Sequence, residues 1–166
     1  MEISSSVTGE STAAAQTSRS QQALSYFVSQ GWSREQAAGI VGNLIQESRL
    51  NPRALNTNEN AQGIAQWTPN GERQARIAQF LGKPILQATF EEQLAAVHWE
   101  LSNGERAAGQ RLRSAVNVEQ ATDTINQTYE RSRAGTRQFL GLSLSEADQT
   151  DIRNRRNNAR SLLSQN

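Results

Sequence analysis

The sequence predicts a mainly α-helical domain that includes one small irregular loop or β-hairpin. Three observations support this class. From Gln21 onward apolar residues follow the 3.6-residue period of a helix, and helix start signals recur at helix-length intervals. The helical pattern is lost between residues 54 and 71, which are rich in Asn, Gly and Gln. The 166 residues, 36% of them apolar, suffice to bury one core, so we expect one folded domain.

The first 20 residues differ in composition from the rest. They are mostly Ser, Thr, Ala, Gly and Gln without apolar periodicity, so we predict a flexible polar tail or linker over 1–20 and a folded domain over 21–166. This stretch also lacks the basic and apolar regions of a secretory signal. We therefore expect the chain to reach any target outside the cell within a larger assembly or through another release system.

The helices are predicted from their start and stop signals. The first covers about 21–30 and ends at Gly31. The second covers about 34–49, opens with a capping box formed by Ser33 and Gln36, and breaks before Pro52. The remaining predicted helices span about 72–81, 90–103, 118–131 and 146–163.

The composition argues against several functions. Cysteine is absent, and one histidine alone does not form a zinc cluster, so we predict no metal and no cofactor. That histidine, His98, lies on an apolar helical stripe and is interpreted as a core residue, as is Trp32. A net charge of +1 gives no electrostatic signature of nucleic-acid binding, and no apolar run reaches the roughly 20 residues of a membrane span.

Glu47 lies near the end of the second predicted helix, at the border of its apolar face. At 100° per residue, Glu47 falls roughly 20° from Ile40 and roughly 60° from Leu44 around the helix axis. Partial desolvation and the negative end of the helix dipole both disfavour the ionised carboxylate, which predicts a raised pKa. A general acid needs a raised pKa to keep its proton near neutral pH. The alternative from spacing alone is an ordinary solvated glutamate.

Two motifs follow one another in the first half of the chain. GIVGNLIQESRLNP at 39–52 is followed by GIAQWTPNGER at 63–73. Together they resemble the phage tail lysozyme family of the lysozyme-like superfamily. A further similarity is Tyr129-Glu130-Arg131, although Ser132 stands where the family tends to have proline. The resemblance implies a lysozyme-like helical domain with the loop or hairpin beside an active-site cleft.

The resemblance also implies an activity and a set of site residues. It implies a muramidase that cleaves the MurNAc-GlcNAc bond of peptidoglycan, with Glu47 as the general acid. Gln66 and Trp67 match the family's hairpin that forms one wall of the glycan cleft, and Tyr129 is a further candidate. Gln62, on the same loop, is added as an expected substrate-binding residue because amide and aromatic side chains suit neutral sugars. For Trp67 and Tyr129, packing in the core is an equally open interpretation.

The second half of the reaction stays open at this point. A hydrolase uses a second carboxylate, and Glu59 is the candidate, although a glutamate in an Asn-rich loop is more commonly solvated. Without such a group, the substrate's acetamido group would assist, or the enzyme would be a lytic transglycosylase. A wall-binding module without turnover and a helical adaptor without glycan contact are further alternatives.

The resemblance points to a virion-associated protein, in a phage tail or inside the virion, that acts on the host periplasm or cell wall. A bacterial secretion system fits the same residues. The expected partners are peptidoglycan glycan strands and, through the N-terminal tail, other virion or tail proteins. We interpret the arginine-rich stretch 131–166 as a solvated face, with attraction to the anionic wall or to an assembly partner as the alternative.

Overall fold

The computed structural model describes residues 4–165, with side chains from residue 13 onward, and it confirms the predicted mainly α class. Its α-helices are α1 (Ser4–Ser29), α2 (Arg34–Ser48), α3 (Arg73–Leu81), α4 (Phe90–Ser102), α5 (Arg106–Arg113), α6 (Val118–Ile125), α7 (Arg133–Phe139) and α8 (Glu146–Ser164). Short helical turns are η1 (Asn70–Glu72), η2 (Ile85–Gln87) and η3 (Asn126–Glu130), and the strands are β1 (Leu55–Asn56) and β2 (Ala61–Gln62).

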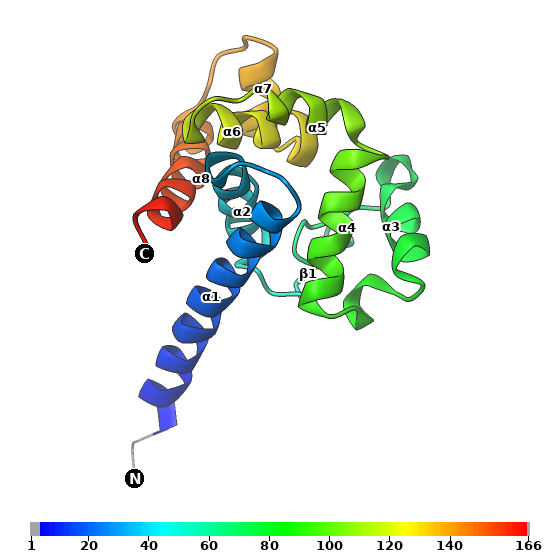
Figure 1. Ribbon diagram of the computed structural model, residues 1–166, viewed down its shortest axis with the longest axis vertical. Helices are drawn as coiled ribbons and strands as arrows, with labels where there is room; N and C mark the ends of the chain where they lie inside the picture. Colours follow the sequence, from blue (N-terminus) through cyan, green and yellow to red (C-terminus); the bar gives the residue numbers. More distant parts are fainter. Residues whose placement is uncertain (1–3, 166) are drawn as a thin grey trace.

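Helix α2 forms the centre of the molecule. It packs against α1, α6 and α8, while α3 and α4 lie on the opposite side from α1 and α8 (Figure 1). Ile40, Val41 and Leu44 of α2 are fully buried in the core. Strands β1 and β2 form an antiparallel hairpin that pairs Leu55 with Gln62. The predicted small hairpin is therefore present.

The start of α1 differs from the prediction. The sequence predicts a helix from about Gln21, but α1 begins at Ser4 and runs without interruption to Ser29, and its N-terminal part extends away from the remaining helices (Figure 1). The expectation that this stretch has no regular structure is wrong for residues 4–20. Ala and Gln favour helices, and a helix anchored at one end extends easily because propagation costs less than nucleation. Residues 1–3 lie outside the described part, and a separate tail function for 1–20 stays a prediction.

The predicted helix over 118–131 is divided. Helix α6 ends at Ile125, and η3 continues as a π-type turn in which the Arg131 amide donates to the Asn126 carbonyl over 2.8 Å. Arg131 then adopts a left-handed conformation with φ 53°. Ser132 caps the next helix by accepting a hydrogen bond from the Gly135 amide. This change in the helix, together with α5 and α7, was not predicted.

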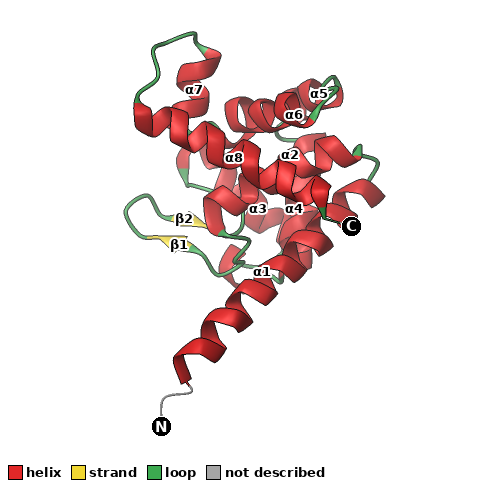
Figure 2. Cartoon of the chain, turned by 90° about the vertical axis from the view of Figure 1, so that its left-hand side faces the viewer, coloured by secondary structure: helices red, strands yellow, loops and turns green. Residues whose placement is uncertain are grey.

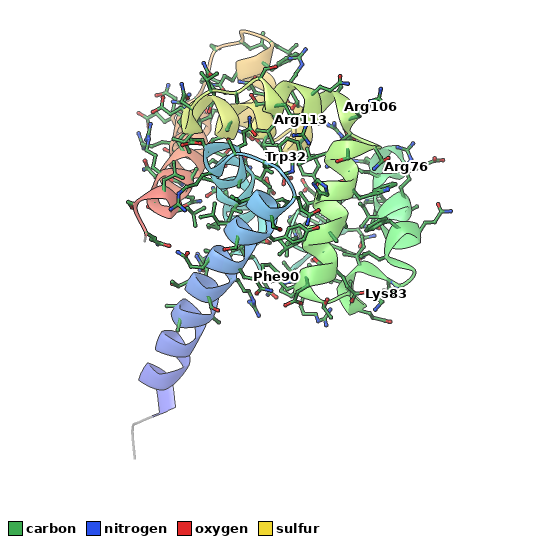
Figure 3. All side chains as sticks on the ribbon, in the orientation of Figure 1. Trp32, Arg76, Lys83, Phe90, Arg106 and Arg113 are labelled. Atoms are coloured by element: carbon green, nitrogen blue, oxygen red, sulfur yellow. The ribbon has the colours of Figure 1, made fainter. Side chains whose placement is uncertain are left out.

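Trp32 lies in the core as predicted, whereas His98, which was also predicted to be a core residue, is only half-buried. Trp32 is buried, and its indole Nε1 donates a hydrogen bond to Nδ1 of His98 over 3.1 Å. The Arg113 guanidinium lies 4.1 Å from the centre of the Trp32 indole, and Figure 3 shows the two side chains close together. Both aromatic side chains are therefore occupied by contacts within the protein.

The two glycines within α2 permit close packing of neighbouring helices. A Cβ atom at Gly39 would lie 2.7 Å from the backbone of Ala121 in α6. A Cβ atom at Gly42 would lie 2.8 Å from both the Cβ and the amide nitrogen of Ala159 in α8. The close approach of α6 and α8 requires glycine at both positions and offsets its cost of about 1 kcal/mol in a helix interior.

Gly42→Ala is expected to destabilise the fold by about 1 to 2 kcal/mol, because overpacking against α8 exceeds the gain in helix propensity. The free energy of unfolding in urea, followed by circular dichroism, measures this change. Gly104→Ala is the matched control, because a Cβ atom there would have no heavy atom within 4 Å. A Gly42 variant as stable as the control would contradict the packing argument.

Contacts with α2 and α4 hold the hairpin in place. Ser48 Oγ, in the last turn of α2, donates to the Ile64 carbonyl over 2.8 Å. Gln93 of α4 is fully buried, and its Oε1 accepts the Ile64 amide over 2.9 Å. Gly63 has a φ of 79°, and a Cβ atom there would lie 2.7 Å from Gln93 Oε1. The Gly63-Ile64 part of the second motif therefore fastens the hairpin beside the end of α2.

Candidate active site

A cavity of about 800 Å³ opens where the end of α2, the hairpin and the segment after η3 meet. Figure 2 shows the hairpin and α7 projecting on the same side of the molecule. The cavity is within the size range of small-molecule sites, and its lining is mostly polar. Its lining residues are Glu47, Asn56, Asn58, Glu59, Ala61, Gln66, Thr68, Asn70, Arg73, Glu130, Arg131, Ser132, Arg133 and Arg155.

Glu47 occupies the last turn of α2 and faces this cavity with a side chain that is 20% exposed. Burial raises the pKa of Glu47, while the Arg155 guanidinium, 2.7 Å away, opposes the rise. The negative charges of Asp151 and Glu59 raise the pKa further. The direction predicted from the sequence is the direction found, and burial is its main cause.

Arg155 of α8 connects Glu47 to the core. Its side chain is only 5% exposed and donates to Glu47 Oε1, to Asn43 Oδ1 over 3.0 Å and to Asp151 Oδ2 over 2.9 Å. The interpretation of the C-terminal arginines as a solvated face is therefore wrong for Arg155. The reason is the closeness of α8 to α2, which brings this position against the interior. The spacing of Asp151 and Arg155, an i,i+4 pair, was the only local signal.

The structure adds one carboxyl group to the site that was not predicted from the sequence, that of Glu130. It lies at the end of η3 and lines the same cavity as Glu47. Its Oε1 is buried and has no hydrogen-bond partner among the described residues. Burial, followed by the charge of Glu47, raises the pKa of Glu130 well above its usual value, and Arg73 and Arg155 oppose this. Glu130 belongs to the Tyr129-Glu130-Arg131 motif, in which only Tyr129 was predicted as a site residue.

Trp67 and Tyr129 lie in the core and do not line the cavity. Trp67 Nε1 and the Tyr129 hydroxyl each donate to Glu100 Oε1 over 2.7 Å. Arg73 donates to Glu100 Oε2 over 2.7 Å and lies 4.4 Å from the centre of the Tyr129 ring. This cluster joins the hairpin, α3, α4 and η3 beneath the site. The structure gives both aromatic residues a packing role, and their direct contact with a glycan stays a prediction.

The two predicted amides have different places. Gln66 lines the cavity, and its Nε2 donates to the carbonyls of Gly63 and Ala54 over 3.0 and 3.3 Å. Gln62 lies instead beside a separate hollow that also borders Pro84 and Ile85. Of the predicted site residues, Glu47 and Gln66 therefore share the cavity, together with Glu59. Contact of Gln62 with substrate stays a prediction.

Comparison with known protein families identifies the family of the chain. The family model described as phage tail lysozyme matches residues 18–165. The chain belongs to the phage tail lysozyme family. A search of curated proteins found no match. The match confirms the resemblance seen in the sequence and the lysozyme-like, mainly α fold.

Membership in the phage tail lysozyme family indicates a phage-associated, lysozyme-like enzyme of the cell wall. No helix between residues 4 and 165 is both long and apolar enough to cross a membrane. Over the same residues, no three His, Cys, Asp or Glu side chains are grouped so as to hold a metal ion. The ionisable side chains that line the cavity are the carboxyl groups of Glu47, Glu59 and Glu130 and the guanidinium groups of Arg73, Arg131, Arg133 and Arg155.

The raised pKa of Glu130 predicts a measurable effect on stability. A carboxyl group that binds its proton more tightly in the folded state lowers stability as the pH rises from its ordinary pKa of 4.5 through the folded value. Glu130→Gln removes this loss, so the stability of the variant relative to the wild type should increase from pH 5 to pH 8. Urea unfolding of both proteins at these pH values measures the difference. If the free energy of unfolding changed with pH by the same amount in the wild type and in Glu130→Gln, the prediction would be wrong.

Proposed function

We propose that this protein is a muramidase that hydrolyses the MurNAc-GlcNAc bond of peptidoglycan, with Glu47 as the general acid. The observation that carries this proposal is a carboxyl group with a raised pKa on the wall of an open polar cavity. A general acid of this kind must be protonated and must also reach the glycosidic oxygen, and Glu47 combines partial burial with access to the cavity.

Arg155 has a defined part in this mechanism. As Glu47 transfers its proton to the leaving oxygen, negative charge develops on the Glu47 carboxylate. The guanidinium of Arg155 is already hydrogen bonded to this carboxylate and held by Asn43 and Asp151. Such a fixed cation stabilises the developing charge without reorganisation. Arg155 is therefore a positioning and stabilising residue, and it does not exchange a proton itself.

The polar wall of the cavity suits a neutral glycan. Asn56 and Asn58 of the hairpin and Gln66 offer amide groups that pair with hydroxyl and acetamido groups. We propose that these side chains orient the sugar rings relative to Glu47, in place of the stacking expected from Trp67.

Membership in the phage tail lysozyme family supports a proposal for the place of action. We propose that the protein is carried in a phage tail or inside the virion and opens the host cell wall locally. The N-terminal part of α1, which extends away from the remaining helices, is the proposed contact with other virion proteins (Figure 1).

Purified sacculi test this function directly. The protein is incubated with sacculi, and the released fragments are identified by mass spectrometry. Hydrolysis at MurNAc yields reducing ends that have gained one water, whereas transglycosylation yields anhydro ends without added water. Binding without release of fragments would identify a wall-binding module, and absence of both would support an adaptor; either result would overturn the proposal.

A further inference from the structure

The environment of Glu130 is not explained by packing or by a general acid at Glu47 alone. A buried carboxylate oxygen without a hydrogen-bond partner carries a free-energy cost, and proteins rarely retain such a group without a use. Glu130 Oε1 is in this state, in a residue that lines the cavity beside Glu47. The π-type turn that ends at Glu130 is a further sign, because such turns are frequent at functional sites.

We propose that Glu130 is a second catalytic carboxyl group that shares one proton with Glu47 and acts as the base for the attacking water. This inference rests on the proposed cleavage of glycan strands by Glu47. Glu59, which was the candidate from the sequence, is exposed on the hairpin loop and is not needed for this step.

Charge balance around the two glutamates supports a shared proton. The two least exposed cations that line the cavity are Arg73 and Arg155, and both already have anionic partners. Arg73 pairs with Glu100 over 2.7 Å, and Arg155 pairs with both Asp151 and Glu47. If Glu47 and Glu130 were both ionised, the two cations would face four carboxylates in a partly desolvated site. Holding one proton between the two glutamates relieves this repulsion.

The other two arginines that line the cavity, Arg131 and Arg133, do not neutralise this excess of negative charge. Arg131 pairs with Glu105 over 2.9 Å, and Arg133 is largely exposed and pairs weakly with Asp148 over 3.5 Å. Solvent screens both side chains more than it screens Arg73 and Arg155. The charged groups that face or border the pair are Glu59, Arg73, Glu100, Arg131, Arg133, Asp151 and Arg155.

The shared proton supplies an acid and a base at the same pH. When the glycosidic oxygen accepts a hydrogen bond from Glu47, the proton resides on Glu47 and Glu130 is ionised. The bond between C1 and the leaving oxygen breaks as Glu47 gives its proton to that oxygen. Water adds to C1 and gives one proton to Glu130, and the proton returns to Glu47 within the pair. Water is thus consumed, and the pair regains its starting protonation.

Glu130→Gln and Glu130→Ala test this role on purified sacculi. An amide does not accept the proton of the attacking water, so Glu130→Gln should lower fragment release by about 100-fold or more. The wild-type rate should fall at low pH, where the pair carries two protons, and the residual activity of Glu130→Gln should lack this acid limb. Formate should partly restore Glu130→Ala, since a small carboxylate fills the vacated position. Chloride at equal ionic strength should not.

Two comparisons separate failure of this inference from failure of the proposed function. Glu119→Gln, a half-exposed glutamate on α6, is the matched control and should retain wild-type activity. If Glu47→Gln is inactive while Glu130→Gln keeps the wild-type rate and pH profile, Glu130 is not the base and glycan cleavage by Glu47 stands. A Glu130→Ala variant that folds but does not respond to formate would also overturn the inference. If Glu47→Gln is fully active, the proposed function itself fails.

Discussion

Glu47→Gln is expected to lower the release of muropeptides from sacculi by about 10²- to 10⁴-fold, the usual contribution of a general acid. The substitution keeps the size of the side chain, and the amide oxygen can still accept the hydrogen bond from Arg155. It removes only the exchangeable acid proton. Fragment release measured under conditions where the wild type is linear in time gives the ratio of rates.

Glu35→Gln is the matched control, because it makes the same change on the exposed face of the same helix. Its rate should equal that of the wild type. Thermal unfolding of both variants shows whether α2 is intact. A folded Glu47 variant with more than about one tenth of the wild-type rate would be incompatible with general acid catalysis by this residue.

Glu100→Ala is expected to destabilise the fold by about 3 to 5 kcal/mol, the usual cost of removing one partner from a buried ion pair. The Glu100 side chain is 3% exposed and accepts hydrogen bonds from Trp67, Arg73 and Tyr129. Its removal leaves the partly buried Arg73 cation without its closest partner, and it leaves two aromatic donors unsatisfied. The free energy of unfolding in urea measures the loss.

The control for Glu100 is Glu119→Ala, which breaks the pair between Glu119 and Arg160 on the surface. Exposed pairs contribute about 0 to 1 kcal/mol, so this variant should remain close to the wild type. Equal losses in the two variants would show that the buried cluster beneath the hairpin contributes no more than an ordinary surface contact.

Local signals predicted the three helices that begin with a complete capping box. Ser33, Thr89 and Ser145 each form the capping box expected from their sequence, and α2, α4 and α8 begin at the next residue. These predictions succeeded because a capping box involves groups only three residues apart, so its geometry depends little on the rest of the chain.

Predictions failed where distant residues set the conformation. The turn η3 and the left-handed Arg131 follow a segment with an ordinary helical pattern. The backbone of Asn126 packs closely on Gly135 of α7, where a Cβ atom would lie 2.6 Å from the Asn126 carbonyl oxygen. Such contacts form only when the helices assemble, and local propensity does not report them.

The sequence by itself determined that Glu47 ends an amphipathic helix at the edge of its apolar face, and its motifs identified the family. The tertiary structure alone decided which groups surround that carboxyl. Arg155 is 108 residues away in the sequence, and Glu130 is brought to the same cavity by the π-type turn. A pKa depends on desolvation and on charges within a few ångströms, so the partners of Glu47 became visible only when the helices were packed together.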